Sequence, residues 1–267
     1  MTGYADRPVV LVGCGRLGSA LVEGWLATGA VDPKDLIILT PSEKPVAEAA
    51  RARGARVNPP MEALHRPRAV VLAVKPAIWR AAVQPLIAAF DHPGVTVSLM
   101  AGVRAADIGG VMPGVITRVM PTTGIAQARG VAALWADADQ WRDEVRPLFA
   151  PIADVVELEH EALMDAATAV AGSAPAFIYA FVQAMAEAGV GQGLSEEAAM
   201  RLARGALRSA GAGLETGEGL DALIARIASP GGTTRAGLDA MSEGGDAARA
   251  AEAAVSAAVA RARALSG

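Results

Sequence analysis

The chain has 267 residues, a formal net charge of −4 at pH 7, 52% hydrophobic residues and one cysteine. This length exceeds that of a usual single domain and can bury a substantial core, so a soluble two-domain enzyme is expected. The mild acidity without a basic stripe argues against a nucleic-acid partner, and the single cysteine, with no recognisable signal peptide, predicts a cytoplasmic protein without an internal disulfide framework.

The first predicted elements are a buried strand over residues 8–12, a glycine turn over 13–18 and a helix over 19–28. They follow the order of the dinucleotide-binding motif, in which the glycines admit the pyrophosphate and let the helix pack closely on the strand. A nicotinamide or flavin nucleotide is therefore favoured over a chance glycine turn. The residues of this turn predicted to contact the cofactor are Gly13, Cys14, Gly15, Arg16, Leu17 and Gly18.

The second strand, Leu36–Leu39, ends without the carboxylate that would bind the ribose 2′-hydroxyl of NAD. Thr40, Ser42 and Lys44 follow instead, and hydroxyls beside a cation suit a 2′-phosphate. Glu43 stands a few residues late and keeps NADH as the alternative. The pattern predicts NADPH as the cofactor, with Thr40 and Ser42 in contact with it.

Strands and helices continue to alternate through the first half of the chain. This alternation predicts an α/β fold with a mostly parallel sheet covered by helices. No strand is predicted after Glu157, so a Rossmann-like NAD(P)-binding domain is expected over residues 1–157 and a helical domain over 158–267. The further predicted strands are 69–74, 95–98, 130–136 and 154–157, with helices over 77–90 and between the last two strands.

The second half is predicted to be helical throughout. Within it, residues 166–186 contain no charged side chain over a length close to that of a membrane-spanning helix. Alanine dominates this stretch, and Gly172, Pro175 and Gln183 interrupt it, so burial inside an oligomer is favoured over a membrane span. The predicted helices are 160–170, 174–188, 195–214, 219–227 and a last one from residue 233 to the end.

The segment 229–234, Ser-Pro-Gly-Gly-Thr-Thr, is the most informative pattern for function. Its glycines allow close backbone approach to a ligand, and the free amides at the start of the following helix form an anion site. Two threonine hydroxyls beside that site suit a small molecule that carries a carboxylate and a polar nitrogen or oxygen. The alternative is a plain loop-to-helix turn.

Together these features resemble the pyrroline-5-carboxylate reductase family, which makes proline by reducing a cyclic imine with NAD(P)H. The resemblance covers nearly the whole chain and implies a Rossmann-like domain followed by an all-α dimerisation and substrate-binding domain. It also implies interlocked homodimers, often five of them in a decamer. The motifs that carry it are residues 13–18, Ala73-Val74-Lys75-Pro76, Ser98-Leu99-Met100-Ala101-Gly102-Val103, Arg118-Val119-Met120-Pro121, Gly172-Ser173-Ala174-Pro175-Ala176-Phe177 and 227–234.

The resemblance assigns roles to individual residues. Thr122 and Gly124 depart from the Asn-Thr-Pro that usually follows Met-Pro in the family, close to the cofactor. The cofactor contacts implied beyond the glycine turn are Ala73, Val74, Lys75, Pro76, Met100 and Ala101. The substrate contacts implied are Ser229, Gly231, Gly232, Thr233 and Thr234.

The distribution of basic side chains favours imine chemistry. The three lysines all lie in the nucleotide half, and the last histidine, His160, stands at the start of the helical domain. A hydroxyacid dehydrogenase would need a lysine or histidine base in that domain to remove a hydroxyl proton. A protonated imine accepts hydride directly, so the Thr234 hydroxyl beside the ring nitrogen suffices, with water as the proton source.

The sequence therefore predicts an NADPH-dependent reductase of L-1-pyrroline-5-carboxylate, with Thr234 as the catalytic residue. Two alternatives stay open: a reductase of another cyclic imino acid with a six-membered ring, and a non-catalytic NADP-binding regulatory protein. No cluster of cysteine, histidine and carboxylate has metal-ligand spacing, so no metal is expected.

Overall fold

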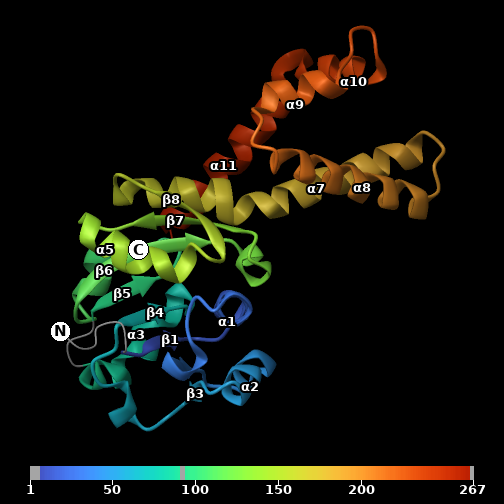
Figure 1. Cartoon of the computed structure of the whole chain (residues 1–267). Coiled ribbons are helices and arrows are strands. Elements are labelled where there is room, and N and C mark those ends of the chain that lie inside the picture. Colours follow the sequence, from blue (N-terminus) through green and yellow to red (C-terminus); the bar gives the residue numbers. More distant parts are fainter. Residues whose placement is uncertain (1–6, 91–93, 265–267) are drawn as a thin grey trace. The chain divides into compact units, whose positions relative to one another are not determined.

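The chain forms two compact units in a computed structural model that describes residues 7–90 and 94–264. The first unit runs to Gly172 and takes in the end of the last helix from Ala258 onward. The second unit runs from Ser173 to Ala257. Every strand of the described residues belongs to the first unit, and the last of them ends at Glu157, so the second unit contains only helices and turns (Figure 1).

The first unit is built on one eight-stranded sheet in the order β3-β2-β1-β4-β5-β6-β7-β8. Every neighbouring pair is parallel except β6 and β7, which confirms the predicted mostly parallel sheet. The order changes direction between β1 and β4, and ligands of such sheets bind beyond the strand ends at this switch point. The strands are β1 (Val9–Val12), β2 (Leu36–Leu39), β3 (Arg56–Val57), β4 (Ala69–Leu72), β5 (Val95–Ser98), β6 (Val115–Pro121), β7 (Gly130–Trp135) and β8 (Ala153–Glu157).

Helices cover both faces of this sheet. Every residue of β1, β4 and β5 is buried, as expected of central parallel strands that have apolar neighbours on both sides. One face packs against α1, α2 and α5, and the other against α3 and α4. The helices of this unit are α1 (Arg16–Thr28), α2 (Pro45–Ala52), α3 (Trp79–Val83), α4 (Ala105–Gly109), α5 (Asp139–Phe149) and α6 (Met164–Ala167).

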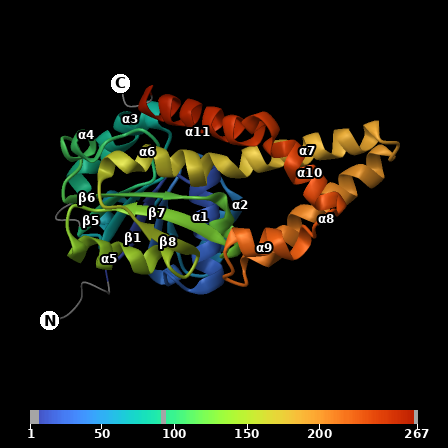
Figure 2. The same ribbon diagram turned by 90° about the horizontal axis from the view of Figure 1, so that it is seen from above.

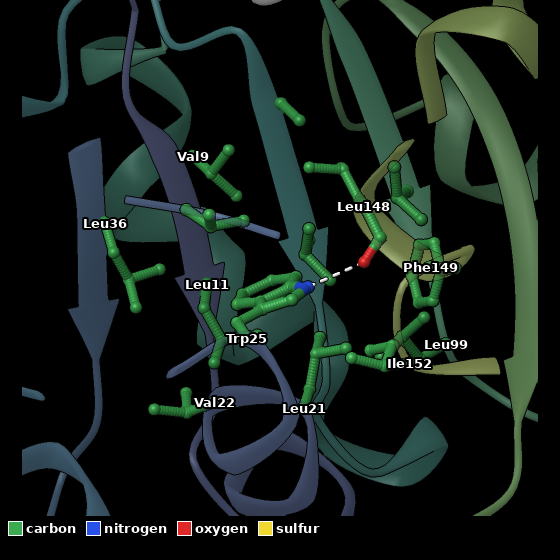
Figure 3. Packing of buried hydrophobic residues seen from close by; sticks show 14 of the residues in the cluster. Val9, Leu11, Leu21, Val22, Trp25, Leu36, Leu99, Leu148, Phe149 and Ile152 are labelled. Atoms are coloured by element: carbon green, nitrogen blue, oxygen red, sulfur yellow. Dashed lines mark hydrogen bonds between the residues drawn. The ribbon is translucent and has the colours of Figure 1, made fainter. Parts of the chain in front are cut away.

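Trp25 anchors the core on the α1 face of the sheet (Figure 3). Its side chain is fully buried among Leu11, Leu21 and Phe149. The indole N–H donates to the carbonyl oxygen of Leu148 at 2.7 Å, so the one polar atom of the ring is satisfied. This bond ties α1, which begins at the glycine turn, to α5 near the end of the nucleotide-binding sequence.

The structure differs from the sequence prediction at three places in this unit. The predicted helix 77–90 is divided into a 3₁₀ turn, the short α3 and a second 3₁₀ segment, Gln84–Ala89, because Pro85 removes an amide hydrogen and disfavours a continuous α-helix. The strand predicted over 69–74 ends at Leu72. Strands β3 and β6 were not predicted, and Arg118 interrupts the apolar pattern of β6.

The second unit contains a helical hairpin followed by α9, α10 and most of α11. Helices α7 and α8 pack side by side, and a turn reverses the chain between them (Figure 2). The predicted helix from residue 233 is instead two helices, because Gly244 and Gly245 adopt positive φ angles of 67° and 73°. The helices are α7 (Ala174–Gly191), α8 (Glu196–Leu214), α9 (Leu220–Ile227), α10 (Thr233–Ser242) and α11 (Asp246–Ala264), the last of which ends in the first unit.

Candidate functional site

The glycine turn after β1 is shaped for a ligand at the start of α1. A Cβ on Gly13, which has a φ of +98°, would lie 2.7 Å from the Ala73 carbonyl oxygen, and a Cβ on Gly18 would lie 2.2 Å from the Gly13 carbonyl oxygen. A Cβ on Gly15 would meet nothing within 4 Å. The first and third glycines are therefore required by packing, whereas the second keeps a space open beside the helix start.

The start of α1 offers free backbone donors to that space. Gly15 is the N-cap, no side chain caps the helix, and its first turn has no acidic residue. The unpaired amides and the positive end of the helix dipole therefore form an anion site of the kind that binds pyrophosphate. Arg16 and Leu17, two of the predicted cofactor contacts, are the first residues of this turn.

Cys14 lies inside the turn as a buried, unreactive side chain. It is 2% exposed, and the Ser19 hydroxyl lies 3.6 Å from its sulfur and donates to its carbonyl oxygen at 3.2 Å. Burial raises the pKa of the Cys14 thiol, although the Ser19 hydrogen bond and the charge of Lys44 act in the opposite direction. The protonated thiol fills space inside the turn, so Cys14 would offer a phosphate only its backbone amide.

The loop after β2 is held by a side chain that the sequence did not single out. Asn58, at a φ of 48°, accepts a hydrogen bond from the Thr40 amide at 2.9 Å and donates to the Thr40 carbonyl at 2.8 Å. The Thr40 hydroxyl, almost fully buried, donates to the Ser42 carbonyl at 3.0 Å. Thr40 therefore organises the loop, and the exposed Ser42 and half-buried Lys44 are the groups accessible to a 2′-phosphate.

The ends of β4 and β5 complete the edge of the sheet. The Ala73 amide donates to Val12 at 2.8 Å and the Leu99 amide donates to Leu72 at 3.0 Å, so the loops after β1, β4 and β5 follow one another along the edge. Lys75 is exposed at the start of the 3₁₀ turn Pro76–Ile78. The predicted cofactor residues of the first unit thus gather at four neighbouring strand ends, with the glycine turn and the β4 loop at the switch point.

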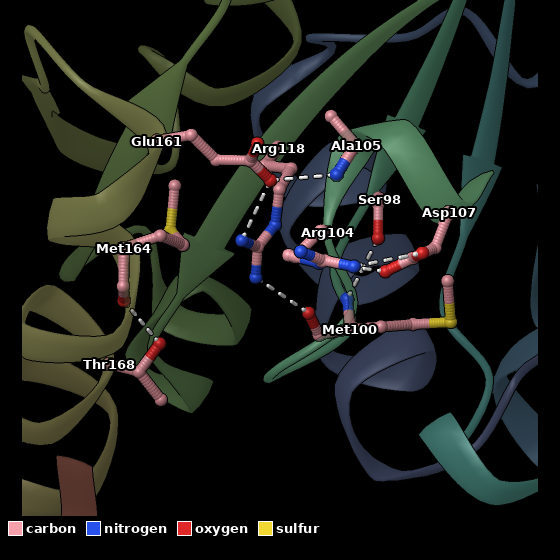
Figure 4. A network of polar contacts seen from close by, with 9 residues as sticks. All are labelled: Ser98, Met100, Arg104, Ala105, Asp107, Arg118, Glu161, Met164 and Thr168. Carbon is pink, nitrogen blue, oxygen red and sulfur yellow. Dashed lines mark hydrogen bonds and ion pairs between the residues drawn. The ribbon is translucent and has the colours of Figure 1, made fainter. Parts of the chain in front are cut away.

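A buried ion pair supports the β5 loop (Figure 4). The Arg118 guanidinium on β6 donates to a Glu161 carboxylate oxygen at 3.0 Å and to the Met100 carbonyl at 3.4 Å. The same Glu161 oxygen accepts the Ala105 amide at 2.7 Å, at the start of α4. On the other side, the Met100 amide donates to the Ser98 hydroxyl at 3.3 Å. Sequence reasoning missed this network, although a cation inside a buried strand indicates that a partner lies elsewhere in the chain.

The substrate segment predicted over 229–234 forms the start of α10 in the second unit. Gly231 has a φ of 72°, and Gly232 is the N-cap, with no side chain capping the helix. The Gly232 amide donates to the Ser229 carbonyl at 3.0 Å, so it closes the turn instead of remaining free for a ligand. The open donors are therefore the amides at the start of α10, and the exposed side chains of Thr233 and Thr234 stand beside them.

Two family models match the chain. Residues 8–102 match the model described as NADP oxidoreductase, coenzyme F420-dependent, and residues 161–265 match the model for pyrroline-5-carboxylate reductase dimerisation. The pyrroline-5-carboxylate reductase of Corynebacterium melassecola is 30% identical over 250 residues, covering 89% of this chain and 91% of that protein. This chain belongs to the pyrroline-5-carboxylate reductase family.

Solved structures of the family have the same fold. The pyrroline-5-carboxylate reductase of Coxiella burnetii aligns over 98% of this chain and 99% of its own length, with a TM-score of 0.86 and 26% identity. The Plasmodium falciparum pyrroline carboxylate reductase, solved with NADP bound, aligns over 99% and 100% with a TM-score of 0.81 and 24% identity. These alignments confirm the predicted order of a nucleotide-binding domain followed by a helical domain.

The helical unit has the exposed apolar surface expected of a dimerisation domain in this family. Tyr179 is 65% exposed and Phe181 51% on α7, and Leu202 is 62% exposed on α8. The helical stretch Glu161–Gly191 is also long and apolar enough to span a membrane, and only 17% of its most apolar part is buried. The match to the dimerisation model supports the favoured prediction, in which a second protein chain and not a membrane covers this surface.

The departures from the family pattern after β6 have a packing role. Thr122 accepts a hydrogen bond from the Val131 amide at 3.2 Å. A Cβ on Gly124 would lie 2.8 Å from the Arg129 carbonyl oxygen, so this position requires glycine.

Among the described residues no group of three histidine, cysteine or carboxylate side chains is arranged to hold a metal, and His92 lies outside the described residues.

Proposed function

We propose that this chain uses NADPH to reduce the cyclic imine L-1-pyrroline-5-carboxylate to L-proline, the last step of proline biosynthesis. The observation that supports this most directly is the start of α10, where uncapped amides stand beside the exposed hydroxyls of Thr233 and Thr234 in a member of this family. A carboxylate and a ring nitrogen are the two polar groups of the substrate; the amides of such a helix start bind a carboxylate, and a hydroxyl beside them can pair with the nitrogen.

The first unit fits an NADP-type nucleotide. The open space at Gly15 and the uncapped start of α1 suit the pyrophosphate, and Ser42 with Lys44 suits the 2′-phosphate. When bound, NADPH supplies the hydride. Residues at the ends of β4 and β5, among them Met100 and Ala101, would hold the nicotinamide half of the cofactor, because they lie on the other side of the switch point from β2.

The residues of the second unit orient the substrate and manage its proton. The amides at the start of α10 hold the carboxylate, and the Thr234 hydroxyl hydrogen-bonds to the ring nitrogen. In the reaction the imine carbon gains a hydride and the nitrogen keeps the proton it received from water, so the C=N bond becomes a C–N bond. The protein contributes mainly the mutual orientation of two bound reactants.

We further propose that residues 1–157 bind the cofactor and residues 158–267 dimerise and bind the substrate. The exposed apolar side chains of α7 and α8 favour at least a homodimer, and five such dimers form the decamer that the family resemblance implies. A cytoplasmic enzyme agrees with the single buried cysteine.

The test is the oxidation of NADPH followed spectrophotometrically with a five-membered and a six-membered cyclic imino acid. The proposal predicts turnover with L-1-pyrroline-5-carboxylate and a higher kcat/KM than for the six-membered imine. Faster reduction of the six-membered ring would identify the alternative substrate, and tight NADPH binding without turnover of either imine would identify a non-catalytic NADP-binding protein.

A further inference from the structure

Met100 is held from both sides by side chains of neighbouring strands. Ser98 and Arg118 lie directly opposite each other in the register of β5 and β6. The Ser98 hydroxyl accepts the Met100 amide at 3.3 Å, and the Arg118 guanidinium donates to the Met100 carbonyl at 3.4 Å. Both backbone polar groups of one loop residue are therefore bound by side chains, next to Gly102, which turns the loop with a φ of 74°.

Burying the Arg118 side chain destabilises the fold unless its charge is paired. Its side chain is 4% exposed, and a buried guanidinium needs an anion close by. Glu161, whose side chain is 24% exposed, provides that anion at 3.0 Å. The carboxylate reaches Arg118 from the 3₁₀ turn Glu161–Leu163, which follows the last strand and precedes α6, so a distant part of the sequence fixes the guanidinium.

The loop that this pair supports faces the place where the nicotinamide is proposed to lie. Met100 is 2% exposed, and the half-buried Ala101 packs with the buried Met120 and Met164. The loop follows β5, immediately beside the β4 loop and on the opposite side of the switch point from the 2′-phosphate residues. A shift of this loop would therefore alter the nicotinamide half of the site and leave the adenosine half unchanged.

We propose that Arg118 and Glu161 are positioning residues, which hold the Met100–Ala101 loop as the wall for the nicotinamide ring. The proposal rests on the proposed function, since it requires a nicotinamide nucleotide in the first unit. Arg118 orients the Met100 carbonyl, and Glu161 orients Arg118 and caps the start of α4 through the Ala105 amide. Neither residue takes part in hydride or proton transfer.

Two ligands separate positioning from a general structural role. NADPH contacts both halves of the site, whereas adenosine 2′,5′-bisphosphate contacts only the adenosine half. The variants are Glu161→Gln, which keeps an oxygen for the Ala105 amide, and Arg118→Lys, which keeps the charge but loses the planar fork. Arg104→Gln is the matched control, because Arg104 ends the same loop and the change removes only its exposed ion pair with Asp107 of α4.

We expect Glu161→Gln and Arg118→Lys to raise the Kd for NADPH by roughly three- to thirtyfold, the order of the net contribution of one hydrogen bond, and to lower kcat. The Kd for the bisphosphate should change less than about twofold, as should both constants in Arg104→Gln. Equal weakening of the two ligands, or no change in either, would overturn the positioning role. If Arg118→Lys does not fold, Glu161→Gln decides alone.

This outcome is distinguishable from failure of the proposed function. Binding of both ligands is measured by titration calorimetry, without any imine and without turnover. A wild-type protein that binds NADPH but reduces no cyclic imine would contradict the proposed reaction and leave the comparison of the two ligands valid. A wild-type protein that binds the bisphosphate as tightly as NADPH would contradict a nicotinamide wall.

Discussion

The two units bury their apolar side chains to very different extents. In the first, helices cover both faces of the sheet, and large side chains such as Trp25 and Phe149 are completely buried. In the second, the only core cluster of the described residues consists of one valine and three alanines from α7 and α8. Large side chains there remain exposed, with Tyr179 at 65%, Leu202 at 62% and Ile227 at 69%.

This difference separates the two tasks of the proposed enzyme. The first unit has a complete core, so its nucleotide site should be intact in a single copy. The second unit buries too little apolar surface to be stable on its own in water. The conformation of its substrate segment should therefore depend on contact with a second copy of the chain. When the copies are separated, NADPH binding should therefore persist, whereas imine turnover should fall.

The strongest effect is expected at Gly18, where an added Cβ would meet the backbone. Gly18→Val places a side chain against the backbone of Gly13, because the new Cβ would lie 2.2 Å from the Gly13 carbonyl oxygen, and this contact is relieved only by shifting backbone. We expect destabilisation by roughly 3 kcal/mol or more and loss of NADPH binding. Thermal unfolding followed by circular dichroism measures the first, and titration with NADPH the second.

Gly15→Ala is the matched control for this prediction. Its Cβ meets no protein atom within 4 Å, so the unfolding temperature should stay close to that of the wild type. The methyl group enters the space assigned to the pyrophosphate and should weaken NADPH binding. A stable Gly18→Val, or a Gly15→Ala that binds NADPH normally, would show that the glycines do not have these two separate roles.

The exposed face of α8 offers the next test. Leu202→Glu puts a charge on a side chain that is 62% exposed in one copy, so it should leave each chain folded and separate the copies. We expect light scattering to give the monomer mass, NADPH binding to persist and imine turnover to fall at least about tenfold. Asp143→Lys, at an exposed position on α5 of the first unit, should change none of these. A wild type that is monomeric at micromolar concentration would contradict the inference that the second unit needs a second copy.

Thr234 tests the chemistry of the second unit. Thr234→Ala should lower kcat/KM by roughly ten- to a thousandfold, or about 1.4–4 kcal/mol, because its hydrogen bond to the ring nitrogen changes during reduction. The Kd for NADPH should stay constant, and Thr234→Ser should retain much of the activity. Steady-state kinetics with each cyclic imine provides the measurement. Full activity of Thr234→Ala on every imine would leave this residue with only a helix-start role.

The smallest effect is expected at the 2′-phosphate site. Lys44→Ala should reduce the preference for NADPH over NADH by roughly three- to tenfold, because Lys44 is half-buried and its charge is partly screened. Glu43→Gln, at the exposed neighbouring position, should change the preference little. The ratio of kcat/KM for the two cofactors is the readout. A wild type that prefers NADH would reverse this assignment and indicate that Glu43 holds the ribose.

Local sequence patterns were sufficient for much of the fold. Apolar β-branched runs predicted β1, β2, β4 and β5, and the glycine spacing placed the nucleotide site at the first turn. Strand β6 was not predicted because Arg118 interrupts its apolar run and Pro121 stands at its end. Arg118 belongs there only because Glu161, far along the chain, compensates its charge, and such a tertiary pairing has no local pattern.

The candidate site was predictable to a similar degree. Ser42 and Lys44 are accessible as expected, whereas the Thr40 hydroxyl is directed to the Ser42 carbonyl within the loop. Asn58 holds that loop from the end of β3, a strand of two residues that is too short to show a periodic pattern. At the start of α10, Gly232 was expected to contact the substrate, but its amide donates to the Ser229 carbonyl and closes the turn. Composition does not predict which acceptor this amide takes.

The most direct test of the proposed function is the stoichiometry of the reaction catalysed by the purified wild-type chain. L-1-Pyrroline-5-carboxylate and NADPH are mixed with the protein, and NADPH consumption and L-proline formation are measured in the same sample. The account predicts one proline formed for each NADPH oxidised, with Thr234→Ala much slower and Gly15→Ala limited by cofactor binding. Absence of proline from a folded, dimeric, NADPH-binding wild type would contradict it.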